Sequence, residues 1–239
     1  MCIRDSVLLA HNVSEEFTYK HETIEKPRVG MIVLAPLRSG EKIGVITKVN
    51  SVLNDSKIKL KFIKEISPEY RLNSKMIKFL NWVSNYNLID RGLVLKMILS
   101  HSKFYFKKKK TKELTSNIKK NVKAIKLSLE QKRASQDILK IFQQRNFKPV
   151  LLDGVPGSGK TEVYFDVIKN FIKDGEQVLI MFPEVSLTGD FVNRIEERFG
   201  FSPVVWHSKI STAYKTKVLK SIIDGTSQII VGARSSLFL

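Results

Sequence analysis

The chain has 239 residues, enough for one large or two ordinary domains with buried cores, and its 43% hydrophobic and 27% charged residues are typical of a soluble globular protein. Because Cys2 is the only cysteine, an internal disulfide framework and a cysteine metal site are excluded, which favours a reducing, cytosolic setting. The net charge of +18, from 41 Lys/Arg against 23 Asp/Glu, indicates a polyanionic partner: nucleic acid first, an anionic membrane second, with a general lysine bias as the alternative explanation.

The sequence gives no sign of a membrane span or a secretory leader. No apolar run approaches the ~18 residues that a membrane helix needs. The apolar residues 7–10 are followed at once by His11 and Asn12, so they are too short for the core of a signal peptide. We therefore expect a cytoplasmic protein that acts on nucleic acid and not on a membrane.

Residues 7–66 have the pattern of a β-rich segment. The apolar run Met31–Ala35 ends at Pro36, and apolar and polar side chains alternate from Lys42 to Val49, which is the period of a half-buried strand. The residues Arg38-Ser39-Gly40 supply a turn between the two runs. The pattern predicts a hairpin.

The period changes to that of a helix from Asn73, which is itself a good helix cap, as is Ser74. Trp82 and Tyr86 share the apolar face of this helix, so we expect them in the core; stacking on nucleic-acid bases is the alternative. Residues 7–101 are thus expected to form a small α+β domain that is barrel-like at its start.

Residues 102–126 separate two regions of different composition. They hold ten lysines and one acidic residue, Glu113, and the aromatic residues Phe104–Phe106 precede the run Lys107–Lys110. A solvated linker, partly helical from about Asn117, is one interpretation. An arm that follows DNA phosphates, with one or two aromatic rings stacking on bases, is the other, and the residues leave the choice open.

Residues 127–239 alternate between helical and strand patterns, as in a parallel sheet covered by helices. The run Gln177–Phe182 is nearly all apolar, which predicts a strand buried on both faces. We expect an α/β lobe of the RecA-like, P-loop type with its first four strands in the sequence. The expected helices are Glu130–Gln144, Lys160–Lys173, Asp190–Phe199 and about Ala213–Asp224, and the expected strands are Val150–Asp153, Gln177–Phe182, Pro203–Trp206 and Gln228–Val231.

The segment after the first of these strands reads G-x-x-x-x-G-K-T and leads into a helix. Glycines let main-chain N–H groups point inward, and the helix N-terminus adds partial positive charge. Lys160 is then expected to reach the β- and γ-phosphates and the Thr161 hydroxyl to ligate Mg²⁺. The pattern predicts a nucleoside triphosphate site; a glycine-rich turn with a chance lysine is the alternative. The residues of the predicted site are Gly154, Val155, Pro156, Gly157, Ser158, Gly159, Lys160, Thr161 and Glu162.

Three blocks of sequence follow successive expected strands: Gly154–Tyr164, Pro183–Thr188 and Gly232–Leu239. Open α/β sheets bind their ligands at the carboxyl ends of the strands, so we expect the blocks to lie close together. In order and spacing, with Leu127–Gln131 ahead of them, the blocks resemble the PriA family of replication-restart helicases (primosomal protein N′) in helicase superfamily 2.

The resemblance implies that Gly154–Glu162 bind ATP and Mg²⁺, although the family has threonine where Pro156 stands. Gln131 resembles the glutamine with which such helicases read the adenine edge; an ordinary surface residue at a helix start is the alternative. Glu184 and Arg234-Ser235 resemble residues that touch the DNA strand. A helix cap is the alternative for Glu184, while the forked guanidinium of Arg234 suits a phosphate.

The resemblance extends into the first domain, where Phe17-Thr18-Tyr19 is similar to the family's F-D-Y and Lys42-Ile43-Gly44 to its R-I-G. In the family this domain binds DNA and captures the 3′ end of a nascent strand. Phe17 and Lys61 stand at positions that resemble the pocket for that end. The family's pocket aspartate is Thr18 here, and its pocket glycine is replaced near Arg38, so recognition of the 3′-hydroxyl is the less secure part of the expectation.

The resemblance also implies parts that this sequence lacks. Only the lysine-rich segment stands where the family has a winged-helix domain, so we expect that domain to be missing. The acidic D-E-E-H motif, the second RecA-like lobe and a zinc-binding insertion are expected beyond Leu239, which makes the chain an N-terminal portion. The first six residues match nothing in the family.

The expected function is an ATP-dependent 3′→5′ DNA helicase, in the bacterial cytoplasm and associated with the nucleoid. It would recognise stalled or abandoned forks and start primosome assembly for replication restart. Its partners would be forked and single-stranded DNA, 3′ ends, primosome proteins and single-strand-binding protein. Alone, the fragment should hydrolyse almost no ATP. The rival interpretations are another superfamily-2 translocase and a non-catalytic scaffold that binds fork DNA.

Overall fold

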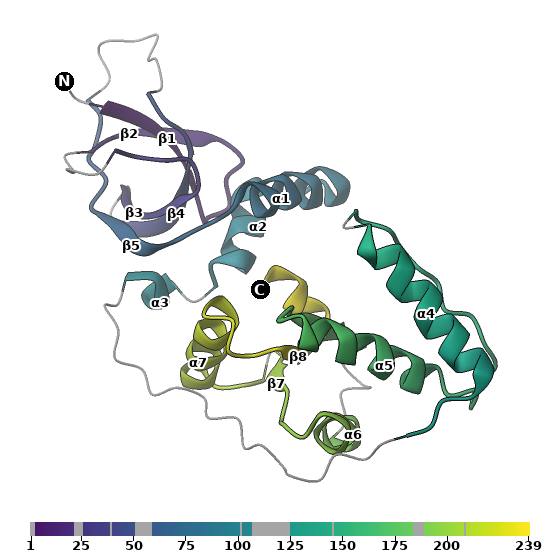
Figure 1. The fold of residues 1–239 in the computed structure, drawn as a ribbon. Helices are drawn as coiled ribbons and strands as arrows, with labels where there is room; N and C mark the ends of the chain where they lie inside the picture. Colours follow the sequence, from purple (N-terminus) through teal and green to yellow (C-terminus); the bar gives the residue numbers. More distant parts are fainter. Residues whose placement is uncertain are drawn as a thin grey trace. The chain divides into compact units, whose positions relative to one another are not determined.

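The computed structural model describes residues 3–21, 26–38, 40–50, 59–100, 102–106, 125–144, 146–183, 189–207 and 209–239. The chain forms two compact units, unit 1 from residues 1–110 and unit 2 from residues 111–237 (Figure 1). Each unit has its own sheet and its own hydrophobic core. Most of the lysine-rich segment (107–124), the block 184–188 with Glu184, and the residues Ser39 and Ser208 lie outside the described residues.

Unit 1 is built on a five-stranded sheet in the order β2-β1-β4-β3-β5, in which all neighbouring strands are antiparallel. The hairpin predicted from the alternating pattern is confirmed, with Leu37 opposite Gly40 next to the turn. The strands are β1 (Ile3–Leu9), β2 (Glu16–His21), β3 (Met31–Leu37), β4 (Gly40–Lys48) and β5 (Glu65–Arg71).

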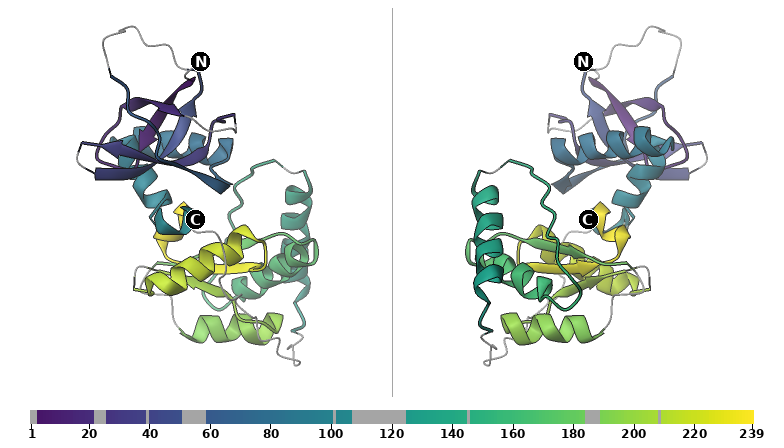
Figure 2. Two further views of the ribbon diagram at one scale, coloured as in Figure 1. Left: turned by 90° about the vertical axis from the view of Figure 1, so that its left-hand side faces the viewer. Right: turned by 90° about the vertical axis from the view of Figure 1, so that its right-hand side faces the viewer.

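The sheet of unit 1 curls but does not close into a barrel, as the two views in Figure 2 show. In the described part of the chain, no ladder joins the edge strands β2 and β5. Only the main chain of Lys20 bonds there: its N–H donates to the Lys61 carbonyl at 2.9 Å, and its carbonyl accepts from Ile63 at 2.8 Å. The barrel-like expectation is wrong about closure, because after these two bonds the chain turns away from β2 and pairs with β3.

Helices α1 (Ser74–Asn87) and α2 (Arg91–Ile98) follow the sheet, and the predicted cap of α1 is confirmed. The Asn73 Oδ1 accepts a hydrogen bond from the Met76 N–H at 2.8 Å. The core of unit 1 is formed by the side chains that point inward from its sheet. Its fully buried members are Val7, Leu9, Tyr19, Val33, Ala35 and Ile46.

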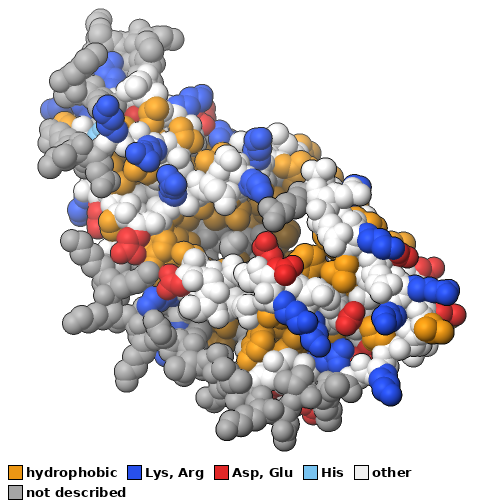
Figure 3. Space-filling model, in the orientation of Figure 1, with side chains coloured by type: hydrophobic (Ala, Val, Ile, Leu, Met, Phe, Trp, Pro, Cys, Tyr) orange, Lys and Arg blue, Asp and Glu red, His pale blue; other side chains and the backbone are white. Residues whose placement is uncertain are grey.

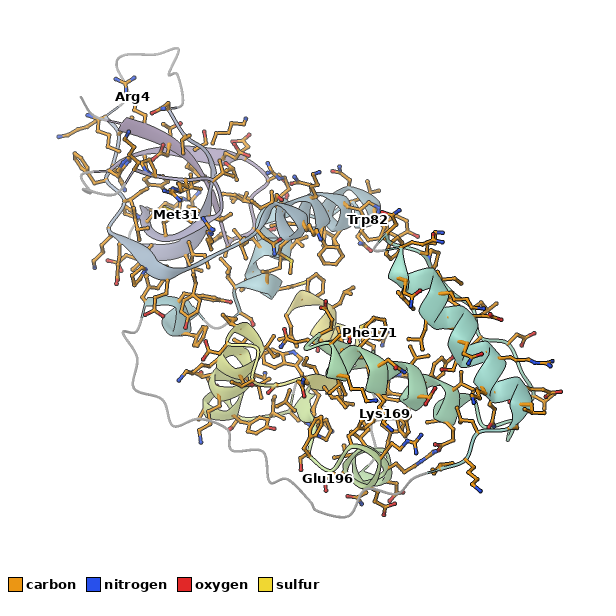
Figure 4. All side chains as sticks on the ribbon, viewed as in Figure 1. Arg4, Met31, Trp82, Lys169, Phe171 and Glu196 are labelled. Carbon is orange, nitrogen blue, oxygen red and sulfur yellow. The ribbon has the colours of Figure 1, made fainter. Side chains whose placement is uncertain are left out.

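Two aromatic residues of α1 lie outside the core, contrary to prediction. The Trp82 side chain projects from the helix (Figure 4) and is 57% exposed, and Tyr86 is 74% exposed. Their rings stack with centroids 5.1 Å apart. The helix buries Leu80 and Val83 instead, so the apolar face inferred from the sequence was too broad.

The segment predicted as a linker begins with a helix that belongs to unit 1, α3 (Ser102–Phe106). Phe104 and Tyr105 are buried and contact Tyr70, with ring centroids 4.8 and 5.7 Å apart respectively. Ser67 Oγ donates to the Tyr105 carbonyl at 2.7 Å. These two rings are therefore not free to stack on bases, and burial raises the pKa of Tyr105 to about 12.

Unit 2 contains a parallel three-stranded sheet in the order β6-β8-β7, as expected for an α/β lobe. Its buried cluster brings together Phe165, Ile195 and Ile229 from two helices and a strand. The bounds agree with the predicted ones to within one or two residues. The strands are β6 (Val178–Met181), β7 (Val204–Trp206) and β8 (Ile229–Gly232), and the helices are α4 (Leu129–Gln143), α5 (Lys160–Lys173), α6 (Gly189–Phe199), α7 (Thr212–Ile223) and the 3₁₀ helix η2 (Arg234–Phe238).

Two strand predictions in unit 2 are wrong. Residues 150–153 form no strand, and Leu151 is 91% exposed, because no described strand pairs with this segment. The strand β6 is not buried on both faces either, since Leu179 and Met181 are 40% and 48% exposed. Its position at the edge of the described sheet leaves one side of β6 unpaired.

Candidate functional sites

The glycine-rich segment of unit 2 forms a loop that runs directly into α5. Gly157 and Gly159 have φ angles of 82° and 79°, in the left-handed region that only glycine adopts without strain. The Ser158 N–H donates to the Val155 carbonyl at 3.2 Å, which closes the turn. The loop conformation is thus dictated by the local sequence and requires no pairing of residues 150–153.

Lys160 lies at the first position of α5 and turns back into the loop. Its ammonium donates to the Gly154 carbonyl and, at 3.2 Å, to the Val155 carbonyl. Thr161 follows in the first turn, half-buried, where the partial positive charge of the helix N-terminus adds to that of the lysine. The predicted phosphate-binding residues therefore come together at one positive end of a helix.

Gln131 reaches the same loop from the start of α4. Its Oε1 accepts from the Ser128 N–H at 2.9 Å, and its own N–H donates to Ser128 Oγ at 3.2 Å, a reciprocal helix cap. Its Nε2 donates to the Ser158 carbonyl at 2.9 Å. A Cβ at Gly159 would collide with this amide. Gln131 therefore connects α4 to the loop. This contact joins residues 27 positions apart, and the sequence pattern did not predict it.

Glu162, the last residue of the predicted site, pairs with a residue that the sequence did not single out. Its carboxylate accepts from Arg194 Nη2 of α6 at 3.0 Å. The guanidinium of Arg194 also lies over the Phe165 ring, 5.8 Å from its centroid. The pair links α5 to α6 and leaves Glu162 pointing toward a helix rather than into the loop.

The carboxyl ends of the three strands meet at one edge of the sheet, since Met181 and Trp206 both lie opposite Gly232. Arg234 and Ser235 follow on η2, and both are exposed. Their side chains are thus available at that edge of the sheet; residues 150–153, which precede the first predicted block, are not part of this sheet, so the predicted convergence of all three blocks stays a prediction. The structure does not describe Glu184.

Unit 1 contains a pocket of about 330 Å³ at the place that the sequence indicated. Phe17 and Lys61 both line it, together with Thr18 and Arg38. The Tyr19 hydroxyl donates to the Pro36 carbonyl at 3.0 Å, and Lys61 Nζ to the Arg38 carbonyl at 3.4 Å, so bonds between β2, the hairpin turn and residues 59–61 hold the walls together.

Two features of this pocket bear on its chemistry. Arg38 has a φ of 52°, in the left-handed region where glycine is favoured, which agrees with its place near the family's glycine. Lys59, which the sequence did not single out, also lines the pocket and adds a third cation to those of Lys61 and Arg38. The arrangement suits a small anionic group.

The charges of unit 1 extend beyond the pocket. Figure 3 shows Lys and Arg side chains gathered over its strands and over α1. Throughout the described ranges, no helix has the length and hydrophobicity to cross a bilayer, and no three His, Cys, Asp or Glu side chains are grouped as a metal site would require.

Comparisons with known proteins match both units. Residues 6–100 match the family model of a 3′ DNA-binding domain of PriA, and residues 128–239 match that of DEAD/DEAH box helicases. The replication restart protein PriA of Rickettsia felis is 36% identical over 212 residues, which cover 88% of this chain and 31% of that protein. Those of Bacillus subtilis and Haemophilus influenzae are 37% and 42% identical over 50% and 38% of this chain, and over 15% and 13% of their own lengths. The chain spans less than a third of the length of these curated relatives.

Proposed function

The chain belongs to the PriA family of replication restart proteins, and we propose that it acts in an ATP-dependent 3′→5′ DNA helicase. This enzyme would recognise stalled or abandoned replication forks and start primosome assembly. One observation carries the proposal: the same chain holds a cationic pocket in a unit that matches a 3′ DNA-binding domain and a formed phosphate loop in a unit that matches a helicase.

The residues of the loop fit a nucleoside triphosphate. The left-handed Gly157 leaves open space beside the main chain for phosphate oxygens, and Lys160 already lies inside the loop. Bound ATP with Mg²⁺ supplies the phosphoanhydride bond whose hydrolysis drives movement along DNA. Lys160 would neutralise the phosphate charge and Thr161 would hold Mg²⁺. Gln131 would read the adenine edge from its place beside Ser158.

The DNA contacts fall into two groups. In unit 1, Phe17 and Lys61 would receive the 3′ end of a nascent strand, with the cation close to the terminal nucleotide. In unit 2, Arg234 and Ser235, with Glu184, would touch the strand along which the motor moves. Arg234 is exposed at the sheet edge, where its guanidinium can bind two phosphate oxygens.

The setting of this activity follows from the family. We propose primosome proteins and single-strand-binding protein as partners, and the bacterial cytoplasm, at the nucleoid, as the location. We propose ATP and Mg²⁺ as the ligands of this chain's own residues, and zinc only as what the family resemblance implies for other parts of the protein. Because the chain spans less than a third of its relatives, we expect it to bind nucleotide and DNA but to hydrolyse almost no ATP by itself.

Binding to synthetic forks tests the DNA half of the proposal. Two forks would be identical except for the end of the leading strand at the branch, which carries a 3′-hydroxyl in one and a 3′-deoxy end, with hydrogen in place of the hydroxyl, in the other. We expect the chain to bind the hydroxyl fork about fivefold more tightly, the effect of one lost hydrogen bond. Equal affinities would contradict 3′-end capture and favour a scaffold or another translocase.

Calorimetric titration with Mg·ATP tests the nucleotide half. The change Lys160→Ala is expected to weaken binding about 100-fold, because the main cation of the loop is lost. Lys169→Ala is the matched control, since Lys169 projects from the exposed face of the same helix (Figure 4). Rapid DNA-stimulated hydrolysis by the 239-residue chain would contradict the expectation that it hydrolyses almost no ATP by itself.

A further inference from the structure

The pocket of unit 1 continues into a second hollow. This hollow has a volume of about 410 Å³, and His11 and Lys42 line it. Phe17, Leu37 and Arg38 line both hollows, so these three residues form the wall that the two spaces share. Both volumes lie toward the lower end of the ~300–1,000 Å³ that is usual for small-ligand sites.

Arg38 holds an unfavourable backbone conformation in that wall. Its φ of 52° is disfavoured for any side chain with a Cβ, and a tight hairpin turn at this place would ordinarily use asparagine, aspartate or glycine. The side chain is exposed, so packing does not explain the choice of arginine. Strained residues that persist without a packing reason are concentrated at binding sites.

The charges around the wall have one sign. Among the described residues, Glu16 is the only acidic one that lines either hollow, and it is already paired with Arg91 at 3.0 Å and Lys48 at 3.6 Å. Lys59 and Lys61 line the first hollow, and Lys42 lines the second. An anion at the wall would therefore meet cations on both sides and no free carboxylate.

We propose that Arg38 binds the phosphodiester that joins the last two nucleotides of a DNA strand. The terminal nucleoside would occupy the first hollow and the preceding one the second, with the ring of Phe17 bordering both. The proposal rests on the proposed capture of a 3′ end by this pocket. The ligand of the pocket would then be the last two nucleotides of a DNA strand, and Arg38 would bind the phosphodiester between them.

Neutral linkages placed at single positions test this inference. Three DNA strands of about ten nucleotides would be compared with the full 239-residue chain by fluorescence anisotropy. One is unmodified, one carries a methylphosphonate at the last linkage, and one carries it in the middle. We expect the terminal substitution to weaken binding about tenfold, and the central one by about twofold, since only the first removes a paired charge.

Variants identify the residue that reads the linkage. Arg38→Gly is expected to remove the tenfold difference between the two modified strands, and Arg38→Lys to keep part of it. The melting temperature of Arg38→Gly should equal or exceed that of the wild type, because glycine relieves the left-handed strain. Lys64→Ala is the matched control: it also removes one positive charge, but Lys64 pairs with Glu41 and lines neither hollow.

The outcomes separate this inference from the function on which it rests. If Arg38→Gly keeps the preference for a charged last linkage, or the wild type shows none, the role of Arg38 is refuted. A 3′-deoxy end on the unmodified strand, which lacks only the terminal hydroxyl, tests end capture independently. If it has no effect while the terminal linkage still matters, the proposed 3′-end recognition fails and the phosphate contact of Arg38 stands.

Discussion

The two candidate sites are held in place in different ways. The pocket of unit 1 is assembled from β2, the β3–β4 turn and residues 59–61, and cross-strand bonds such as that of Tyr19 to Pro36 fix its walls. The phosphate loop of unit 2 is one continuous stretch, and the segment just before it is unpaired, with Leu151 91% exposed. The first site depends on the register of a sheet, whereas the second depends on turn chemistry and on the two helices that adjoin it.

The comparison shows how much packing each kind of site needs. A loop with glycines at left-handed positions adopts its shape from local sequence, and Gln131 of α4 adds a single tether. A pocket with walls from distant parts of the chain exists only while the sheet is intact. Partial unfolding of the sheet in unit 1 should therefore abolish DNA capture, whereas partial unfolding of the sheet in unit 2 should leave the conformation of the glycine-rich loop largely intact.

Two leucine-to-alanine changes give the largest contrast. Leu9→Ala is expected to destabilise unit 1 by about 2–5 kcal/mol, because Leu9 is fully buried in the cluster against which Phe17 and Leu37 of the pocket wall pack. Leu151→Ala should change the stability of unit 2 by less than about 0.5 kcal/mol. Each unit has one tryptophan, Trp82 or Trp206, so fluorescence in urea can follow their unfolding separately once the other is changed to phenylalanine. A large cost for Leu151→Ala would show that residues 150–153 are packed and would remove the contrast.

The carboxylate of Glu16, which lines the pocket, gives a pH-dependent test of intermediate size. Burial alone would raise the pKa of Glu16, but hydrogen bonds from Arg91 and Thr47, and the nearby charges of Arg91 and Lys48, outweigh it and lower the pKa below its ordinary value of 4.5. A lowered pKa contributes stability above about pH 4.5, and this contribution is lost as the pH falls through the pKa of the folded state.

Arg91→Ala is therefore expected to destabilise unit 1 by about 1–2 kcal/mol at neutral pH, and by less as the pH falls through the Glu16 pKa. Lys48→Ala serves as the control, since its side chain is 72% exposed and its 3.6 Å contact with Glu16 should contribute little. Urea unfolding followed at a series of pH values measures both. A constant cost of Arg91→Ala at every pH would mean that the arginine acts through packing and not through Glu16.

The two helix caps give the smallest test, and it compares the units directly. Asn73→Ala and Ser128→Ala each remove a side-chain cap, and each should cost its own unit about 1 kcal/mol of stability. Only Ser128→Ala should also weaken ATP binding, by about two- to fivefold, because it removes the Oγ that accepts from the Gln131 N–H and so loosens the first turn of α4, which carries Gln131 beside the loop. Calorimetric titration of both variants would decide this. Equal ATP affinities would show that Gln131 holds its place without the cap.

Features of the fold that depend on a short stretch of residues are predicted correctly from the sequence. The hairpin at residues 31–48, the Asn73 cap and the bounds of α5 follow from alternation, capping and glycine placement, and the structure has all three. The grouping of Phe17 and Lys61 in one pocket came from family resemblance, because no pattern in the residues themselves pairs positions so far apart.

The wrong predictions of burial have a common cause: a pattern along the sequence does not show which distant residues will pack against a given side chain. Apolar runs at 150–153 and 177–182 predicted buried strands, but burial depends on neighbouring strands and on layers that cover both faces. No described strand pairs with 150–153, and the face of β6 that holds Leu179 and Met181 stays partly exposed. Trp82 was assigned to the core because it is apolar, although Leu80 and Val83 fill that side of α1. The lysines after Phe104 and Tyr105 favoured a linker, but in the structure both rings pack against Tyr70.

The sequence by itself predicted an α/β second unit, the positions of its helices and the glycine-rich loop that leads into α5, because composition, periodicity and glycine spacing are local properties of the chain. Only the tertiary structure decided that the first sheet stays open, that Arg194 pairs with Glu162, and that Arg38 stands between two hollows. These facts depend on which distant segments lie side by side, and that is settled by long-range packing and pairing rather than by any short stretch of residues.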